Sequence, residues 1–392
     1  MKIAILTSGI LPVPAVQGGA VENLIDFYLE YNNKYKLHDI TVYSIYDKCV
    51  EKHPALCSKV NNYKYIKTKS IYAKAEKLIR RFFYKKGVYH HVIEYYLDKV
   101  IKQISRQNFD VIILENRPHY TIKLSDLKYK KLIVHLHNEH LTKTSYMSKE
   151  IYNKVDRFIC VSDYISNIVK SIGNKNDKVI TVHNGINLDT FSQIDNSIVC
   201  RKALGLNRND FVLIYSGRIN KDKGISELID ALILLKEFSN IKLLILGSSF
   251  FGNTNSDDIF ISKLKEKAKI LNNNIIFTGF IPYRNVPSFL KIADVAVIPS
   301  IWNDPFPTTV LEAQAIGLPI ITTNKGGIRE EVSKENAIIL NVDSNFKNKL
   351  SESILYLYNN QETRNNMGIA SKKRALLFSK EEYAKNFFKA LE

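Results

Sequence analysis

The sequence predicts an α/β protein made of two doubly wound units, each with a mainly parallel sheet. Strand-like and helix-like segments alternate from one end of the chain to the other, and the strand-like segments are continuous apolar runs. Continuous apolar strands separated by helices are typical of a parallel sheet that is covered on both faces. At 392 residues the chain is also too long for one typical core, which favours two domains.

The first series of strands starts at KIAILTS (2–8), a run that lacks the basic, apolar and small-residue order of a secretory signal. AVENLIDFYLEYNNKY (20–35) follows with the apolar spacing of a helix. Further buried strands are predicted at DITVYSI (39–45), FDVIILE (109–115), KLIVHLH (131–137), RFICVS (157–162) and KVITVHNG (178–185).

A second series starts after the polar stretch NGINLDTFSQIDNS, which separates an expected domain 1–190 from an expected domain 191–375. Its strands are predicted at DFVLIYSG (210–217), IKLLILG (241–247), NIIFTGF (274–280), ADVAVIPS (293–300), LPIITT (318–323) and NAIILNV (336–342). Helices fit between them, for example GISELIDALILLKEF (224–238).

Composition narrows the class of protein. Hydrophobic residues make up 45% and charged residues 24%, values typical of a globular protein. No apolar run approaches the roughly 18 residues of a membrane-spanning helix. The four cysteines (Cys49, Cys57, Cys160 and Cys200) lack paired metal spacing, so we expect reduced thiols in a cytoplasmic protein and no metal site.

The net charge of +17 is unevenly spread, because residues 64–106 hold twelve Lys or Arg and three Asp or Glu. A basic helix with an apolar face suits an anionic membrane surface. Nucleic acid is a competing partner, and a solvated helix packed on its own domain is the third interpretation. We favour the membrane, with contacts from Lys74, Lys77, Arg80, Arg81, Phe82, Phe83, Lys85 and Lys86.

Ligands bind outside the carboxyl ends of strands in open α/β sheets, so residues that follow the strands are the first candidates. Gly18 and Gly19 precede a helix and let backbone N–H groups approach an anion or a sugar, although a flexible loop is the alternative. His137 ends its strand and could act near a reacting centre, whereas His135 fits a core histidine. The absence of G-x-G-x-x-G and G-x-x-x-x-G-K-[ST] argues against an NAD enzyme or a P-loop ATPase.

YSGRINKDKG opens the second unit with two cations in one turn. Gly217, Arg218, Lys223 and Gly224 follow a buried strand and precede a helix. Two cations beside a helix N-terminus form a favourable site for a diphosphate, although charged turn residues are often only solvated.

IWNDPFPTTVLEA follows the strand VAVIPS and carries two carboxylates, Asp304 and Glu312. We expect a helix to begin near Thr309, with Glu312 in its first turn and backbone N–H groups from Phe306, Pro307, Thr308 and Thr309 directed at a ligand. Carboxylates can accept hydrogen bonds from paired sugar hydroxyls. A helix cap and a carboxylate that complements the helix dipole are the alternative interpretation.

These motifs resemble the family-4 group of retaining glycosyltransferases with the GT-B fold, over nearly the whole chain. The matching stretches are QGGAVENLI, HLHNE, TVHNGINLDTF, GRINKDKG and ADVAVIPSIWNDPFPTTVLEAQAIGLPIITTNKGG. The resemblance implies two Rossmann-like domains that face each other across a cleft. It also implies that the C-terminal helix, residues 376–392, returns to complete the first domain.

The resemblance also implies roles for single residues. Glu312 corresponds to the residue that holds the nucleotide ribose, and Asp304 to the acid beside the donor sugar. Arg218 and Lys223 correspond to the residues that bind the diphosphate, Gly19 to the loop that faces it, and His137 to the histidine near the sugar. Asp304 stands where Glu is usual, and PFP replaces the more common PFG. Both changes bear on the identity of the donor sugar.

The expected function is transfer of a hexose from a nucleotide sugar, with UDP favoured, to a glycan or lipid-linked acceptor in bacterial surface polysaccharide synthesis. Front-face attack would retain the anomeric configuration, and side-chain cations would replace a metal, so no cofactor is expected. We expect a peripheral protein on the inner face of the plasma membrane that does not bind nucleic acid. A nucleotide-sugar 2-epimerase and a non-catalytic sugar-nucleotide-binding protein are the alternatives.

Overall fold

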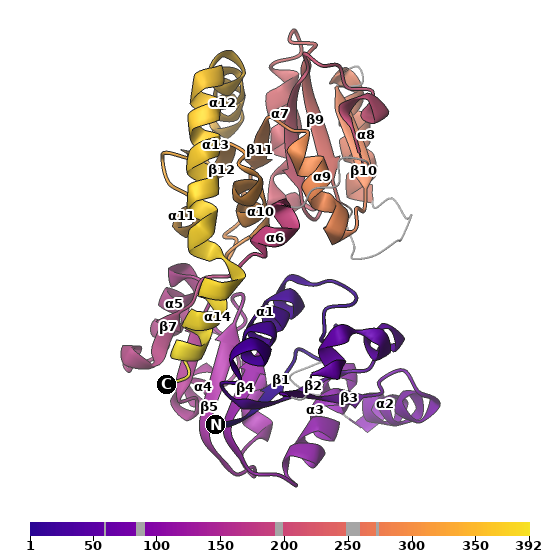
Figure 1. The fold of residues 1–392 in the computed structure, drawn as a ribbon, viewed down its shortest axis with the longest axis vertical. Helices are drawn as coiled ribbons and strands as arrows, with labels where there is room; N and C mark the ends of the chain where they lie inside the picture. Colours follow the sequence, from indigo (N-terminus) through magenta and orange to yellow (C-terminus); the bar gives the residue numbers. More distant parts are fainter. Residues whose placement is uncertain (59, 84–90, 193–198, 248–258, 272–273) are drawn as a thin grey trace. The chain divides into compact units, whose positions relative to one another are not determined.

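The computed structural model describes residues 1–58, 60–83, 91–192, 199–247, 259–271 and 274–392, apart from the side chains of 80–83 and 91. The chain forms two compact units. The first contains residues 1–185 together with 380–392, and the second contains residues 186–379. Each unit is a parallel sheet with helices packed against it (Figure 1).

The sheet of the first unit has seven strands in the order β3-β2-β1-β4-β5-β6-β7, and every neighbouring pair is parallel. Its strands are β1 Lys2–Leu6, β2 Asp39–Ile45, β3 Asn61–Ile66, β4 Phe109–Glu115, β5 Tyr129–Leu136, β6 Arg157–Cys160 and β7 Val179–Thr181. Its helices are α1 Ala20–Tyr35, α2 Ile71–Phe83, α3 His91–Ile104, α4 Ser148–Lys154, α5 Asp163–Lys170 and α14 Lys380–Lys389.

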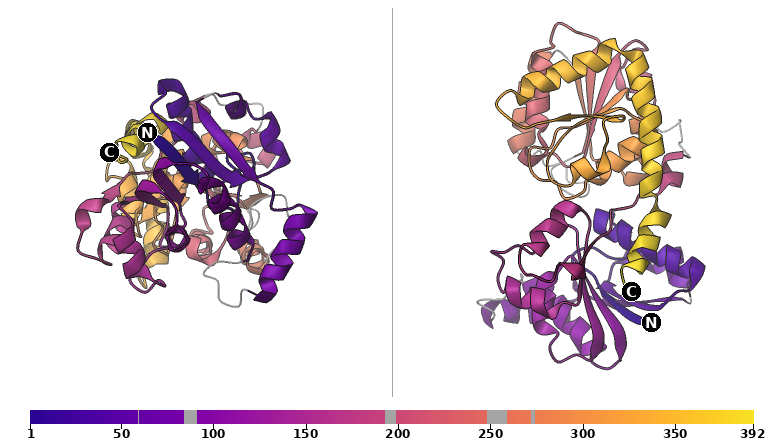
Figure 2. Two further views of the ribbon diagram at one scale, coloured as in Figure 1. Left: turned by 90° about the horizontal axis from the view of Figure 1, so that it is seen from below. Right: turned by 90° about the vertical axis from the view of Figure 1, so that its left-hand side faces the viewer.

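The C-terminal helix α14 packs on α1, although more than 340 residues separate them along the chain. The rings of Tyr28 and Phe387 stack at a centroid distance of 4.1 Å and an interplanar angle of 2°. Tyr383, Phe387 and Phe388 are buried in the same core as β1 and α1. The last residues of the chain therefore complete the core of the first unit, and both views of Figure 2 show the C-terminus close to the N-terminus.

The sheet of the second unit has six parallel strands in the order β10-β9-β8-β11-β12-β13. Its strands are β8 Phe211–Ser216, β9 Ile241–Leu246, β10 Ile275–Gly279, β11 Val295–Ile298, β12 Ile320–Thr323 and β13 Ala337–Leu340. Its helices are α6 Leu188–Ser192, α7 Ile225–Ile233, α8 Ile259–Ala268, α9 Val286–Lys291, α10 Thr308–Ile316, α11 Ile328–Glu331, α12 Phe346–Asn359 and α13 Gln361–Ala375.

The predicted fold class is confirmed, since both sheets are parallel and helices connect their strands. The sequence did not predict β3, because NNYKYI is polar and lies at the edge of its sheet, where alternate side chains meet solvent. The helix expected over 224–238 is shorter and ends at Ile233. Among the described helices, none has both the length and the apolar character to cross a bilayer.

Candidate active site

Most of the predicted site residues follow the strands at which each sheet reverses its winding, whereas His137 follows β5. In the first unit the strand order reverses between β1 and β4, and in the second between β8 and β11. Ligands of doubly wound sheets bind beside such a switch point, outside the carboxyl ends of the strands. Gly18 and Gly19 follow β1, Arg218 and Lys223 follow β8, and Asp304 follows β11.

The turn after β8 is held in a defined shape by its own side chains. The Tyr215 hydroxyl donates a hydrogen bond to the Arg218 carbonyl at 2.6 Å, and the Asn220 side chain accepts one from the Lys223 N–H at 3.2 Å. Gly224 ends the turn with φ +69°, and a Cβ there would lie 1.9 Å from the Pro299 carbonyl oxygen. Only glycine therefore lets this turn pass so close to the loop after β11.

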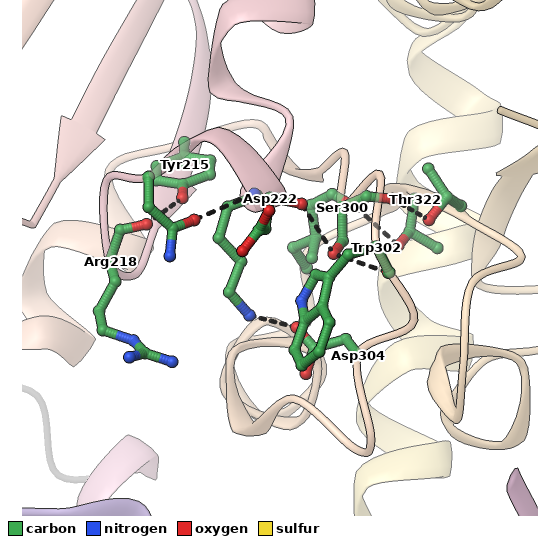
Figure 3. A network of polar contacts seen from close by, with 11 residues as sticks. Tyr215, Arg218, Asp222, Ser300, Trp302, Asp304 and Thr322 are labelled. Carbon is green, nitrogen blue, oxygen red and sulfur yellow. Dashed lines mark hydrogen bonds and ion pairs between the residues drawn. The ribbon is translucent and has the colours of Figure 1, made fainter. Parts of the chain in front are cut away.

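The loop after β11 is bound to this turn by hydrogen bonds and by one ion pair (Figure 3). The Ile301 N–H donates to the Asp222 carbonyl at 3.0 Å, and Lys223 Nζ pairs with an Asp304 carboxylate oxygen. The Lys223 side chain is 19% exposed and that of Asp304 only 8%. The side chains of Arg218 and Asp304 extend from the two loops toward the same side in Figure 3.

Helix α10 begins at Thr308, and Pro307 is its N-cap residue without a side-chain cap hydrogen bond. A Cβ on Gly217 would lie 3.8 Å from Thr309 Cγ2, so the start of α10 adjoins the Arg218 turn. The first-turn N–H groups of a helix lack intrahelical partners and favour anions. The cationic turn and this helix N-terminus therefore lie together in one corner of the second unit, where positive charge and helix N-terminal N–H groups would favour an anion.

Two details of the predicted acidic motif need correction. Glu312 lies in the second turn of α10, because the helix begins at Thr308 and its first turn holds no acidic residue. Pro307 has no backbone N–H to offer a ligand. The Phe306 side chain is buried against Phe378, with a centroid distance of 5.7 Å, so Phe306 could reach a ligand only through its backbone.

The Glu312 carboxyl is buried, with 5% of the residue exposed. Burial raises its pKa to about 8, against the opposing effect of a hydrogen bond with the Thr308 side chain. Glu312 is therefore mainly protonated at pH 7 in the free protein. A second buried carboxyl, Glu331 of α11, was not predicted; burial and then the charge of Asp304 raise its pKa well above the usual range. IREEV carries no motif that would have singled out Glu331.

In the first unit, Gly18 and Gly19 have φ of +75° and +109° and lead into α1. A Cβ on Gly19 would lie 2.2 Å from Glu22 Oε2, because the Glu22 carboxyl folds back against the loop. Burial raises the pKa of Glu22, and Ser8 Oγ lies 3.4 Å from its Oε1. The loop that was expected to face a diphosphate thus carries a buried carboxyl directly beside it.

His137 follows β5 and belongs to a buried cluster around Glu115, the last residue of β4. Glu115 Oε2 lies 3.1 Å from both His135 Nδ1 and His137 Nε2, and Oε1 accepts a hydrogen bond from the Tyr28 hydroxyl at 2.9 Å. Burial would raise the pKa of Glu115, but His135 and His137 lower it to about 2. Burial and then His135 lower the pKa of His137 to about 4. Sequence reasoning missed Glu115, although it ends a buried strand at the ligand-binding edge.

These three side chains are also close enough to share a metal ion. Their outer nitrogens, His135 Nε2 and His137 Nδ1, are buried without hydrogen-bond partners. If a metal bound the inner nitrogens, each outer nitrogen would carry a buried N–H without an acceptor, whereas metal-bound histidines normally donate that hydrogen bond. If instead the inner nitrogens, His135 Nδ1 and His137 Nε2, carry the protons, the Glu115 carboxylate accepts a hydrogen bond from each of them. The cluster therefore fits a hydrogen-bonded carboxylate better than a metal centre.

Replacement of Glu115 with Gln is expected to lower the free energy of unfolding by about 1–3 kcal/mol. A Gln side chain offers only one acceptor oxygen, with two lone pairs, so at least one of the three donors around Glu115, namely the two imidazole N–H groups and the Tyr28 hydroxyl, loses its acceptor. Urea denaturation measures the change, with the exposed Glu150→Gln variant as the control. An unchanged unfolding free energy for the Glu115 variant would contradict the assignment of both inner protons.

The basic segment includes the end of β3, the helix α2 and the helix α3. Residues 84–90, between α2 and α3, lie outside the described part, and they include Lys85 and Lys86. The side chains of Arg80, Arg81, Phe82 and Phe83 also lie outside it. Lys74 is exposed, whereas Lys77 Nζ donates to the Thr68 carbonyl at 2.7 Å. Ile71, Tyr72, Leu78 and Ile79 of α2 are 83%, 88%, 55% and 57% exposed. These apolar side chains of α2 are thus more than half exposed, whereas Ala73 of the same helix is buried.

Two family models match the chain. The one described as Glycosyltransferase Family 4 matches residues 62–190, and the one described as Glycosyl transferases group 1 matches residues 198–374. The first match lies in the first unit except for its last five residues, 186–190, and the second lies in the unit that carries Arg218, Lys223, Asp304 and Glu312.

Similar proteins support the same assignment. YtcC of Bacillus subtilis (strain 168) is 28% identical over 382 residues, which cover 94% of this chain and 86% of that protein. The capsular polysaccharide biosynthesis glycosyltransferase CapM of Staphylococcus aureus is 34% identical over 195 residues, 49% of this chain and 48% of its own. The crystal structure of Anabaena Alr3699/HepE in complex with UDP-glucose superposes with a TM-score of 0.73 at 19% identity and covers 100% of this chain and 99% of that one. The chain therefore belongs to the family-4 glycosyltransferases and has their GT-B fold.

Proposed function

We propose that the protein is a retaining, metal-independent glycosyltransferase that moves a hexose from a UDP-sugar to a glycan or lipid-linked acceptor. Bacterial surface polysaccharide synthesis is the proposed setting, supported by the similarity to CapM. UDP is favoured as the nucleotide because the similar HepE protein was crystallised with UDP and with UDP-glucose.

The anion-binding corner of the second unit is the observation that carries this proposal. It combines the Arg218 and Lys223 side chains with the N-terminus of α10, all beside the switch point of the sheet. A lysine ammonium has three N–H donors, so Lys223 can keep its bond to Asp304 and still donate to a phosphate oxygen. The buried Glu312 lies one helical turn beyond, where a nucleoside ribose would bring two hydroxyls.

In the proposed reaction the bond between the sugar C1 and the diphosphate oxygen breaks, and a bond from C1 to the acceptor oxygen forms on the same face. Negative charge develops on the leaving UDP, where Arg218, Lys223 and the α10 N–H groups stabilise it. The proton of the acceptor hydroxyl passes to the leaving phosphate oxygen. Asp304, fixed by Lys223, would accept a hydrogen bond from a sugar hydroxyl.

Proton NMR of the reaction products tests this proposal. Incubation with a UDP-hexose and an acceptor glycan should give UDP and a product whose anomeric configuration equals that of the donor, without added divalent metal and with EDTA present. A product with the opposite configuration would contradict retention. Conversion of the UDP-hexose into its 2-epimer would favour the epimerase, and release of no product from any donor would favour the non-catalytic alternative.

We also propose that the protein binds peripherally to an anionic membrane surface, on the cytoplasmic face of the membrane. The exposed apolar side chains of α2 support this proposal. The protein is expected to co-sediment with phosphatidylglycerol vesicles at low salt and to be released as the ionic strength rises. The Ile71→Ser/Leu78→Ser variant should bind more weakly than the wild type. Absence of vesicle binding at low salt would refute this part of the proposal.

A further inference from the structure

A pocket of about 470 Å³ lies in the first unit, between the end of β3 and one face of α3. Its volume falls in the range of ordinary small-molecule sites. Four of its lining residues are cations, namely Lys67, Lys99, Lys102 and Arg106. None of the residues that line it is acidic, so the pocket concentrates positive charge from two separate elements.

Local structural needs account for only part of this charge. Lys102 lies in the last turn of α3, and Arg106 lies just after the end of this helix. Cations near the C-terminus of a helix complement the helix dipole. Lys99 pairs with Glu76 at 2.8 Å. Lys67 comes from the opposite side of the pocket, and within the described residues neither it nor Lys102 nor Arg106 has an acidic partner. The helix dipole does not account for Lys67, which follows β3 and whose Nζ lies 5.2 Å from the centroid of the Tyr46 ring.

The other lining side chains include hydrogen-bond donors, among them Ser70 and Tyr95. Several cations with hydroxyl donors in one concave site match a compact group with more than one negative charge, as in a phosphate or diphosphate ester. A single carboxylate would leave most of the positive charge uncompensated. Ser70 is followed directly by Ile71 and Tyr72, which are 83% and 88% exposed, so an apolar chain attached to the phosphate would find apolar surface next to it.

We propose that this pocket binds the phosphate or diphosphate group of a lipid-linked acceptor, an inference that rests on the proposed glycosyltransferase function. Tyr65 and Ile66 end β3 at the same sheet edge as Glu115 of β4. β3 and β4 are three strand spacings apart, roughly 14 Å. That separation leaves room for the acceptor's sugar between the bound phosphate and the sheet edge at which Glu115 and His137 lie.

Calorimetric titration with geranyl diphosphate, inorganic diphosphate and geraniol tests this pocket. All proteins carry Arg218→Ala, which weakens the other predicted diphosphate site. The pocket variant Lys67→Gln/Lys102→Gln/Arg106→Gln is compared with Lys128→Gln/Lys143→Gln/Lys149→Gln, which removes the same charge from exposed positions of the first unit outside the pocket. Circular dichroism verifies that both variants fold.

Geranyl diphosphate is expected to bind the protein with the intact pocket, and the pocket variant should bind it about tenfold or more weakly, with little change in the control variant. Inorganic diphosphate should bind more weakly than geranyl diphosphate, and geraniol least. If both variants lost the same amount of affinity for geranyl diphosphate, the overall charge of the protein would explain the effect, and the proposal would be overturned. Equal affinity for inorganic and geranyl diphosphate would overturn the lipid-linked ligand. UDP titration of proteins with native Arg218 tests the proposed function separately, because the pocket substitutions should leave UDP binding unchanged.

Discussion

Replacement of Arg218 with Ala is expected to lower the rate of sugar transfer by about 10²–10³-fold. The Arg218 side chain extends from the turn after β8 (Figure 3), and this turn adjoins the start of α10, where negative charge would develop on the departing diphosphate. The loss should appear in both kcat and the KM for the donor, because Arg218 binds the diphosphate of the donor and meets additional negative charge in the transition state. Steady-state kinetics with a UDP-hexose donor measure it.

Arg218→Lys is the matched variant, since it keeps the positive charge but loses the planar fork of donors. It should retain more activity than Arg218→Ala. The exposed Arg208→Ala in the same unit controls for loss of one charge and should leave transfer unchanged. Near-normal kcat in Arg218→Ala would contradict the assignment of this residue to the leaving group.

The affinity for UDP is expected to rise by up to about tenfold per pH unit as the pH increases from 7 to 8, and then to level off. The free protein holds Glu312 with a pKa of about 8, so its carboxyl is mainly protonated below that pH. Hydrogen bonds from two ribose hydroxyls favour the ionised form and lower the pKa in the complex. Binding near pH 7 therefore releases a proton from Glu312, and a higher pH favours the complex.

Titration calorimetry at pH 7 in phosphate and in Tris measures this proton release, because the two buffers differ in their heat of ionisation. Glu312→Gln, which cannot ionise, should lose both the proton release and the pH dependence. The same raised pKa means that this group stabilises the folded state less as pH rises from about 4.5 toward 8. Equal heats in both buffers would show that Glu312 does not change its protonation on binding.

The strands of both sheets were predictable because each buried strand is a continuous apolar run between turns, and IAIL and FVLIY are examples. The strand β3 was not predictable, because an edge strand with one exposed side lacks a continuous apolar run. The crossing of α14 onto the first unit does not follow from local patterning, since the stacking of Tyr28 on Phe387 depends on residues far apart in the sequence.

The residues of the candidate site were also only partly predictable from the sequence. Arg218, Lys223 and Asp304 were found because they follow buried strands, and the structure joins Lys223 to Asp304. Glu115 and Glu331 were missed, because their importance lies in burial and in the partners that tertiary packing provides or withholds. The turn of α10 that holds Glu312 was also misplaced, since the start of a helix after two prolines is poorly defined by sequence.

Thermal unfolding with a panel of nucleotide sugars tests most directly whether the second unit holds a nucleotide-sugar site. A ligand that binds only the folded protein raises its melting temperature by mass action. At least one nucleotide sugar, with UDP-hexoses first, should raise the melting temperature of the wild type and should protect the Arg218→Ala variant much less. If no nucleotide sugar protects the wild type, or if all protect the variant equally, the corner formed by Arg218, Lys223 and α10 is not a donor site.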